Sequence, residues 1–139
     1  KYNRLAAKLG FSINYDVCGY GLSIPHYGTI VVGSTNKIGN YCVLHTSTCI
    51  TANGKVIGDN LYCSTGAKLT GKVILGNNVM IAANSVVTKS HEEGNVLLAG
   101  MPATVKAARE PWWAASETFT QRVKKIEELR EQYGLCLPR

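Results

Sequence analysis

The sequence lacks a secretory signal and any apolar run long enough to cross a bilayer, which takes about 20 residues. It also lacks a C-x-x-C pair among its five cysteines, which are Cys18, Cys42, Cys49, Cys63 and Cys136. An odd number of cysteines without paired spacing is not typical of a disulfide framework, so we predict reduced thiols in a cytoplasmic protein. The chain begins with Lys1 rather than methionine, and we expect an upstream segment in the full protein.

A stripe of Arg and Lys interleaved with aromatic residues, which is typical of nucleic-acid-binding surfaces, is also missing. The formal net charge is +6, but the basic residues are scattered and cluster only mildly near Lys124 and Lys125. We therefore expect no nucleic acid as a partner, whereas a phosphate-bearing cofactor suits the positive charge. The 139 residues, 45% of them hydrophobic, suffice for one domain with its own core.

The sequence does contain three runs in which every sixth residue is apolar and suited to face the interior of the fold. The runs are Cys18, Ile24 and Ile30; Ile38, Leu44 and Ile50; and Ile57, Cys63, Leu69, Leu75, Ile81 and Val87. A step of eight joins the first two runs, and a step of seven joins the last two. This period fits neither a strand nor an α-helix. It predicts a mainly β fold, a left-handed parallel β-helix of hexapeptide repeats, in which each coil stacks on the one before.

The hexads also predict which other residues lie inside and how the chain is divided. Small or aliphatic residues four positions after each inward residue form a second inward set, Leu61, Ala67, Val73, Val79 and Ser85.

We expect a helix over residues 1–10, the β-helix over 11–95, a tail folding back over 96–115, and a helix over 116–139. In the last helix Thr118 to Gln121 resembles a capping box and Gly134 is a stop signal. Its apolar stripe is expected to dock either on the same subunit or on a helix of another subunit.

In a stacked coil, residues one coil apart lie one above the other and form a column. The column positions predict different surroundings for the three histidines, His26, His45 and His91. His26 follows an inward residue by two positions, and the positions above it are predicted to be Thr46, Thr65 and Ala83, with His45 diagonal to His26. Above the histidines this column is small and nearly featureless, so a long thin ligand such as a pantetheine arm fits along it. Its reactive end would point at His26, and an imidazole is the usual general base for a hydroxyl proton.

The expected chemistry is direct attack of an acceptor hydroxyl on a thioester. An acyl-enzyme needs an activated nucleophile, for which Ser23 and Cys49 remain open candidates. His45 either supports His26 or contacts the acceptor, and His91, in a polar loop, is expected to be exposed and inert. The alternative is a zinc site, as in gamma-class carbonic anhydrases, but no close-spaced histidine pair supplies a third ligand, so we expect no metal.

Three segments resemble bacterial serine O-acetyltransferases. Residues 21–33 (GLSIPHYGTIVVG) resemble their catalytic-histidine segment, residues 81–87 (IAANSVV) their last coil, and residues 99–103 (AGMPA) the turn that follows the coils. The resemblance extends from about Gly19 to Lys106 and implies that His26 is the general base of an acetyl-CoA-dependent enzyme. It further implies a homotrimer with sites between subunits. For the cofactor it implies contacts with Thr65, Gly66, Ala82 and Ala83 along the column, and with Thr104 and Lys106 near the phosphates.

The chain departs from that family where the amino-acid acceptor would bind. Pro25 replaces the aspartate that precedes the family's histidine, Phe11 falls where a second acidic residue is expected, and residues 51–56 are too few for the loop that carries a second histidine. An ammonium group would then lack a carboxylate partner. His45, in contrast, resembles a histidine of capsular-polysaccharide O-acetyltransferases.

These departures lead to three functional hypotheses. We predict first an acetyl-CoA-dependent O-acetyltransferase acting on a hydroxyl of a sugar or polysaccharide precursor. The alternatives are a serine O-acetyltransferase of cysteine biosynthesis and a non-catalytic trimeric scaffold.

Overall fold

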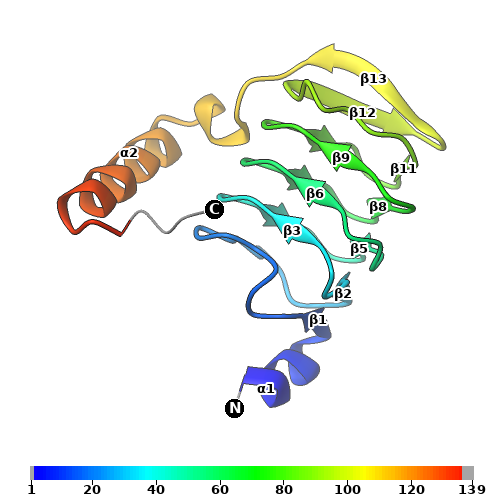
Figure 1. The fold of residues 1–139 in the computed structure, drawn as a ribbon, viewed down its shortest axis with the longest axis horizontal. Coiled ribbons are helices and arrows are strands. Elements are labelled where there is room, and N and C mark those ends of the chain that lie inside the picture. Colours follow the sequence, from blue (N-terminus) through cyan, green and yellow to red (C-terminus); the bar gives the residue numbers. More distant parts are fainter. Residues whose placement is uncertain (1, 136–139) are drawn as a thin grey trace.

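The structure is a computed structural model that describes residues 2–135, and it shows a coil of short strands stacked on three faces (Figure 1). Sheet A has the order β1-β2-β5-β8-β11, sheet B the order β3-β6-β9, and sheet C the order β13-β12-β10-β7-β4. All coil strands pair in parallel, as a stacked coil requires, and only β13 runs antiparallel to its neighbour. The fold is therefore the predicted left-handed parallel β-helix.

The strands are short because each face of the coil is only a few residues wide. Sheet A contains β1 (Phe11–Ile13), β2 (Ile30–Val32), β5 (Cys49–Ile50), β8 (Lys68–Leu69) and β11 (Val86–Val87). Sheet B contains β3 (Lys37–Ile38), β6 (Val56–Ile57) and β9 (Ile74–Leu75). Sheet C contains β4 (Val43–Leu44), β7 (Tyr62–Cys63), β10 (Met80–Ile81), β12 (Val96–Gly100) and β13 (Ala103–Ala108).

The core is the narrow interior of this prism. Within each strand the inward residue is buried and stacks on its equivalent one coil away, as Leu44, Cys63 and Ile81 do in sheet C. The second inward set predicted from the hexads is confirmed, since all five of its members are buried: Leu61, Ala67, Val73, Val79 and Ser85. Each coil therefore buries its apolar side chains only against its neighbours.

Glycine follows the inward residue at one corner of the coil because the next coil passes too close for a side chain. A Cβ placed on Gly39 would lie 2.7 Å from the backbone carbonyl carbon of Gly58. A Cβ on Gly58 would lie 2.8 Å from the same atom of Gly76. A methyl group at either position would force the stacked backbones apart.

The register of the first coil differs from the prediction. Val32, not Ile30, stacks on Ile50, while Ile24 keeps its predicted place because the adjacent Ser23 bridges to Val43. The extra residues of the step of eight therefore lie between Ile24 and Val32, and the step from Val32 to Ile38 is an ordinary six. Ile30 is also buried, and this is why the sequence pattern alone does not distinguish the two registers.

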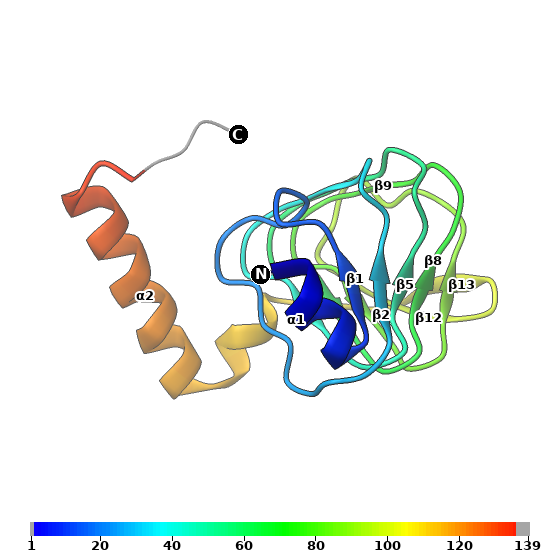
Figure 2. The same cartoon turned by 90° about the horizontal axis from the view of Figure 1, so that it is seen from below.

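The two ends of the coil are covered differently. Helix α1 (Tyr2–Leu9) lies across the first coil (Figure 2). It buries Ala6, and the Tyr2 phenol donates a 2.7 Å hydrogen bond to the Ile13 carbonyl. Gly10 ends this helix with a φ of +80°, as predicted. At the other end β12 still pairs in parallel with β10, and β13 then turns back along it. Stacking therefore continues past residue 95.

Helix α2 (Glu117–Gln132) stands beside the prism and is joined to it by the 3₁₀ helix η1 (Trp112–Ala115) (Figures 1 and 2). Ser116, not the predicted Thr118, occupies its N-cap, and the Ser116 side chain makes no capping hydrogen bond. Gly134 has a φ of +60° just after the helix, as its stop signal predicts. The part of the expected helix beyond residue 135 lies outside the described residues. No residue of α2 is buried, so the helix is an arm rather than part of the core.

The remaining observations concern the hydrophobicity of the helices and the state of the cysteines. Within residues 2–135 no helix is long and apolar enough to cross a membrane. Cys18, Cys42, Cys49 and Cys63 are free thiols, and Cys136 lies outside the described residues. Cys63 faces the core, where burial raises the pKa of its thiol.

Candidate active site at the sheet C to sheet A corner

The site is built where the chain leaves sheet C and turns toward sheet A. His45 directly follows β4, and His26 lies in the long connection between Ser23 and β2. The centres of the two imidazole rings are 6.4 Å apart, with planes inclined by 47°. His26 is exposed and His45 is half-buried. The structure thus brings together the two histidines that the sequence predicted as neighbours.

The residue that stacks on Thr46 is not His26. A Cβ placed on Gly28 would lie 3.2 Å from Cγ2 of Thr46, and the amide of Ser47 donates a 2.7 Å hydrogen bond to the Thr29 carbonyl. Thr46 therefore lies against Gly28 and Thr29, and the prediction that it covers His26 is wrong. The reason is the shifted register, because the extra residues of the first coil fall within the His26 segment.

His45 is held by an aromatic residue of the next coil. Its Nε2 atom lies 2.9 Å from the phenol oxygen of Tyr62, and the two ring centres are 5.2 Å apart. Burial lowers the pKa of His45, and the nearby His26 lowers it further. His45 is therefore uncharged at neutral pH, and one of its ring nitrogens can accept a hydrogen bond.

The column of small residues consists of Thr46, Thr65 and Ala83, one from each coil. Backbone hydrogen bonds link each of these coils to the next. The amide of Gly66 donates to the Thr46 carbonyl at 3.0 Å, and the amide of Asn84 donates to the Thr65 carbonyl at 2.9 Å. Within residues 2–135 the amide N–H groups of Thr65 and Ala83 have no hydrogen-bond partner, and both residues are exposed. The column therefore presents unpaired donors one coil apart, which suits the amide carbonyls of an extended pantetheine arm.

The other predicted cofactor residues lie near the top of this column. The amide of Ala82 is engaged with the Leu98 carbonyl at 2.9 Å, so this N–H is not available to a ligand. Thr104 lies opposite Ala99 in the β12–β13 pair, beside the sheet C to sheet A corner. Lys106 is two residues further along β13, and both Thr104 and Lys106 are exposed. Lys106 therefore extends the polar end of the column away from the corner.

Tyr62 and Trp112 were not predicted from the sequence as site residues. The centre of the Tyr62 ring is 6.4 Å from that of Trp112 in η1, whose own ring is 5.4 Å from Phe119. A row of rings thus leads from His26 through His45 and Tyr62 to the tail of the chain. The sequence places Tyr62 outward, directly before the inward Cys63, but it predicts neither the contact of Tyr62 with His45 nor the return of Trp112 to this face.

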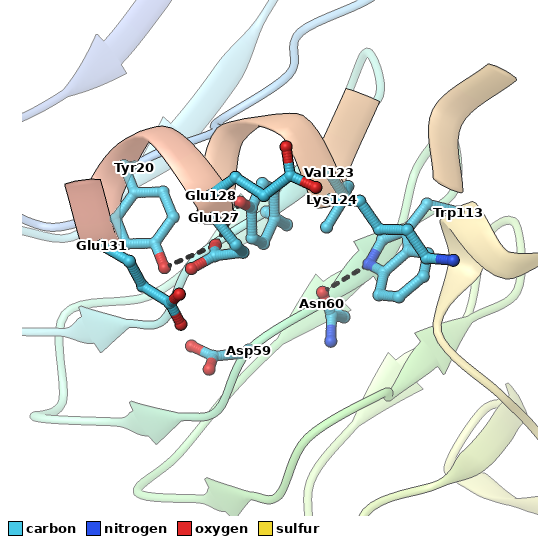
Figure 3. Close-up of a pocket in the computed structure, with 10 residues that line it drawn as sticks. Tyr20, Asp59, Asn60, Trp113, Val123, Lys124, Glu127, Glu128 and Glu131 are labelled. Carbon is cyan, nitrogen blue, oxygen red and sulfur yellow. Dashed lines mark hydrogen bonds between the residues drawn. The ribbon is translucent and has the colours of Figure 1, made fainter. Parts of the chain in front are cut away.

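A separate groove of about 490 Å³ lies at the corner where the chain enters sheet C, beneath α2 (Figure 3). Tyr20, Tyr41 and Asn60 line it from the coil, and Glu127 lines it from the helix. These residues precede the sheet C strands, whereas the histidines follow them, so the groove lies away from the site. Some of its polar groups are hydrogen-bonded to one another: Tyr20 donates to Glu127 at 2.9 Å, and Trp113 donates to Asn60 at 2.9 Å.

The third histidine is remote from the other two. His91 forms an isolated bridge with Leu75 of sheet B and lies 3.9 Å from a carboxylate oxygen of Glu93. Its side chain is only 17% exposed, so the expectation of an exposed histidine is wrong. In the described part of the chain, no cluster of three or more His, Cys, Asp or Glu residues could hold a metal ion.

Comparisons with known proteins find serine acetyltransferases, both by sequence and by fold. No family model matches the chain. The serine acetyltransferase of Staphylococcus xylosus is 35% identical over 127 residues, which are 82% of this chain and 57% of that protein. The serine acetyltransferase of Synechococcus elongatus is 31% identical over 94 residues, which are 63% of this chain and 38% of that protein. The chain thus spans less than two thirds of the length of these curated relatives.

Solved structures show the same relationship. The serine acetyltransferase of Neisseria gonorrhoeae superposes with a TM-score of 0.66 at 25% identity, over 81% of this chain and 46% of that one. The enzyme of Brucella abortus gives a TM-score of 0.67 at 28% identity, over 78% of this chain and 46% of that one. The resemblance to capsular-polysaccharide O-acetyltransferases stays a prediction. The chain is therefore a hexapeptide-repeat, serine acetyltransferase-like protein built on a left-handed β-helix.

Proposed function

We propose that the protein is an acetyl-CoA-dependent O-acetyltransferase with His26 as its general base. The observation that carries this proposal is the pairing of His26 with His45, 6.4 Å apart, beside the column of small residues that begins at Thr46, directly after His45. This pairing occurs on a coil that is similar to those of serine acetyltransferases. An exposed imidazole at the end of such a column can reach a hydroxyl brought beside a thioester.

The reaction follows from these groups. An imidazole nitrogen of His26 takes the proton of the acceptor hydroxyl while the oxygen attacks the thioester carbonyl. The tetrahedral intermediate then collapses, the carbon–sulfur bond breaks, and the imidazolium returns the proton to the CoA sulfur. Direct transfer needs no acyl-enzyme, and among residues 2–135 no hydrogen bond joins Ser23 or Cys49 to a histidine that would activate it as a nucleophile.

Acetyl-CoA binds along the column in this proposal. The unpaired amides of Thr65 and Ala83 bind the pantetheine carbonyls, and Gly66 and Ala82 keep the path narrow and free of side chains. Thr104 and Lys106 lie at the far end, where Lys106 meets the phosphates of CoA. The amides and small residues fit such a ligand because donors repeat once per coil along an otherwise featureless strip.

The acceptor divides the proposal into two candidates. The curated relatives are serine acetyltransferases, which makes serine O-acetylation the better-supported alternative. A saccharide hydroxyl, our prediction from the sequence, is favoured by two features of this site. Pro25 rather than an acidic residue precedes His26, and Nε2 of His45 is bonded to the phenol of Tyr62 rather than to a carboxylate.

The deciding experiment measures CoA thiol release from acetyl-CoA with L-serine and with a panel of nucleotide sugars, and identifies the acetylated product by mass spectrometry. Turnover with serine alone would establish the first candidate, and turnover with sugars alone would establish the second. If no acceptor is acetylated and His26→Ala changes nothing, the coil is a non-catalytic scaffold and the proposal fails.

We further propose a homotrimer in which each site lies between the coils of two subunits, as the resemblance implies. This arrangement would supply walls on both sides of the exposed His26. Sedimentation equilibrium tests it, because a monomeric mass at micromolar protein would contradict it.

A further inference from the structure

The phenol of Tyr62 contacts the histidine that lies beside the proposed general base. We propose that Tyr62 is a positioning residue: its hydroxyl donates to Nε2 of His45 and so keeps the ring proton of His45 on Nδ1. This inference rests on the proposed function, in which His45 belongs to the reaction site. It adds a role to a residue that the resemblance does not include.

The direction of the hydrogen bond follows from the groups available. A tyrosine hydroxyl can either donate or accept a hydrogen bond. His45 is uncharged at neutral pH and has one acceptor nitrogen. The 2.9 Å contact is the one hydrogen bond of the Tyr62 hydroxyl within residues 2–135. An imidazole nitrogen is a stronger base than a phenol oxygen, so the hydrogen bond is stronger with the Tyr62 O–H as its donor, and the hydrogen left without a protein partner is then Nδ1–H of His45.

The tautomer determines what His45 offers to a ligand. If Nε2 accepts from Tyr62, then Nδ1 carries a hydrogen, and in the described chain Nδ1 has no hydrogen-bond partner. The Nδ1–H group can then donate to an oxygen of the acceptor or of the thioester beside His26. The two histidines thereby have different tasks, since His26 accepts a proton and His45 donates a hydrogen bond.

The tail of the chain holds Tyr62 in place. Trp112 packs against the Tyr62 ring at 6.4 Å, and its indole N–H donates a 2.8 Å hydrogen bond to the Tyr41 carbonyl. The Tyr62 ring therefore lies between His45 on one side and an anchored indole on the other. A side chain fixed in this way loses little further freedom when the site is occupied, which is what a positioning role requires.

The test is a long-range ¹H–¹⁵N correlation spectrum of the ¹⁵N-labelled protein at pH 8, in which the His45 signals are assigned from the His45→Gln variant. We expect His45 to have its proton on Nδ1 in the wild type and to gain the Nε2–H form in Tyr62→Phe. The Phe variant keeps the ring and its contact with Trp112. The matched control is Tyr15→Phe, which removes the hydroxyl of a tyrosine that is 85% exposed and should leave the tautomer unchanged.

The kinetic counterpart separates positioning from binding. Tyr62→Phe should lower kcat about tenfold with an unchanged KM for acetyl-CoA, because one hydrogen bond is lost near the reacting groups. An Nε2–H wild-type His45, or a tautomer that Tyr62→Phe does not move, would overturn the inference. A tautomer that responds in a protein that acetylates no acceptor would instead overturn the proposed function, and the hydrogen-bond assignment would stand.

Discussion

The guanidinium carbon of Arg130 lies 3.4 Å from the centre of the Tyr20 ring, which joins the last helix to the first coil. Glu127, on the same side of α2, accepts hydrogen bonds from the phenols of both Tyr20 and Tyr41. Its other carboxylate oxygen is 3.8 Å from Nε of Arg130. Since no residue of α2 is buried, this small polar cluster and η1 fix the position of the helix.

Replacing Glu127 should therefore release α2 without unfolding the coil. Glu127→Ala removes the acceptor of two phenol hydrogen bonds, each worth about 1–3 kcal/mol, and an ion pair with Arg130 worth about 0–1 kcal/mol. We expect amide hydrogen exchange in residues 117–132 to accelerate by about tenfold or more, while exchange in the coil strands stays the same. The control is Glu128→Ala, which removes a carboxylate that is 70% exposed and does not contact either tyrosine. Equal exchange rates for α2 in both variants would contradict this account.

The same cluster predicts an alkaline release of α2. Burial raises the pKa of Tyr41 and of Tyr20, and the hydrogen bond to Glu127 raises both further. A raised pKa in the folded state means that the stabilisation is complete below the unfolded value of about 10 and is lost as the pH rises above it. Amide exchange in α2, corrected for its intrinsic pH dependence, should accelerate from about pH 10 upward. In Glu127→Ala this pH dependence should be weaker, and an unchanged dependence would exclude the tyrosines as its source.

The proposed general base predicts a split between turnover and binding. His26→Ala should lower kcat by roughly 10²–10⁴-fold, because the hydroxyl proton loses its acceptor. The affinity for acetyl-CoA, measured by calorimetry, should stay within about twofold. His91→Ala serves as the control, since His91 bridges to sheet B and lies away from the pair of histidines. Full activity in His26→Ala would remove His26 from the mechanism.

A large side chain at Ala83 should obstruct the proposed cofactor path. Ala83 is exposed, so Ala83→Trp does not disturb the core, but it fills the strip beside the unpaired amides. We expect the KM for acetyl-CoA to rise at least about tenfold, with a free energy of unfolding within about 0.5 kcal/mol of the wild type. Ala52→Trp places the same side chain at an exposed position after sheet A and should leave the KM unchanged. Normal acetyl-CoA kinetics in Ala83→Trp would move the cofactor elsewhere.

The core predicts where the coil is most sensitive to truncation. Leu69 is completely buried and stacks between Ile50 and Val87, one coil away on either side. Leu69→Ala leaves a cavity between two coils and should lower the free energy of unfolding by about 2–5 kcal/mol. Urea denaturation measures this, with Leu5→Ala as the control because Leu5 is 58% exposed in α1. A loss below about 1 kcal/mol would mean that adjacent coils close the cavity.

Parts of the fold were predictable because inward residues repeat at a fixed spacing. The run from Ile57 to Val87 gives its own register, since its members repeat every six residues without a break and each one is buried. The first coil was different: Ile30 and Val32 are both buried, and both suit the inward column. Only the pairing of Val32 with Ile50 places the extra residues in the His26 segment.

The candidate site shows the same division. The column offset and the motif around His26 predicted that the two histidines meet, because both lie on a coil whose geometry repeats. The partner of His45 was not predictable in this way, since Tyr62 reaches it diagonally from the next coil. The position of Trp112 was even harder to predict from the sequence, because this residue returns to sheet C from a tail that leaves the hexad repeat.

The sequence by itself determined the coil, its inward columns and the pair of histidines, because a stacked repeat makes residues one coil apart into spatial neighbours. Tertiary structure decided the register of the first coil, the phenol that holds His45 and the docking of α2 by Glu127 and Arg130. The register depends on which of two buried residues pairs with Ile50, and the other two features depend on side chains that meet across 17 to 107 positions of sequence without any repeat to relate them. Periodic backbone geometry can be read from spacing, whereas a contact between non-equivalent side chains exists only once the chain has folded.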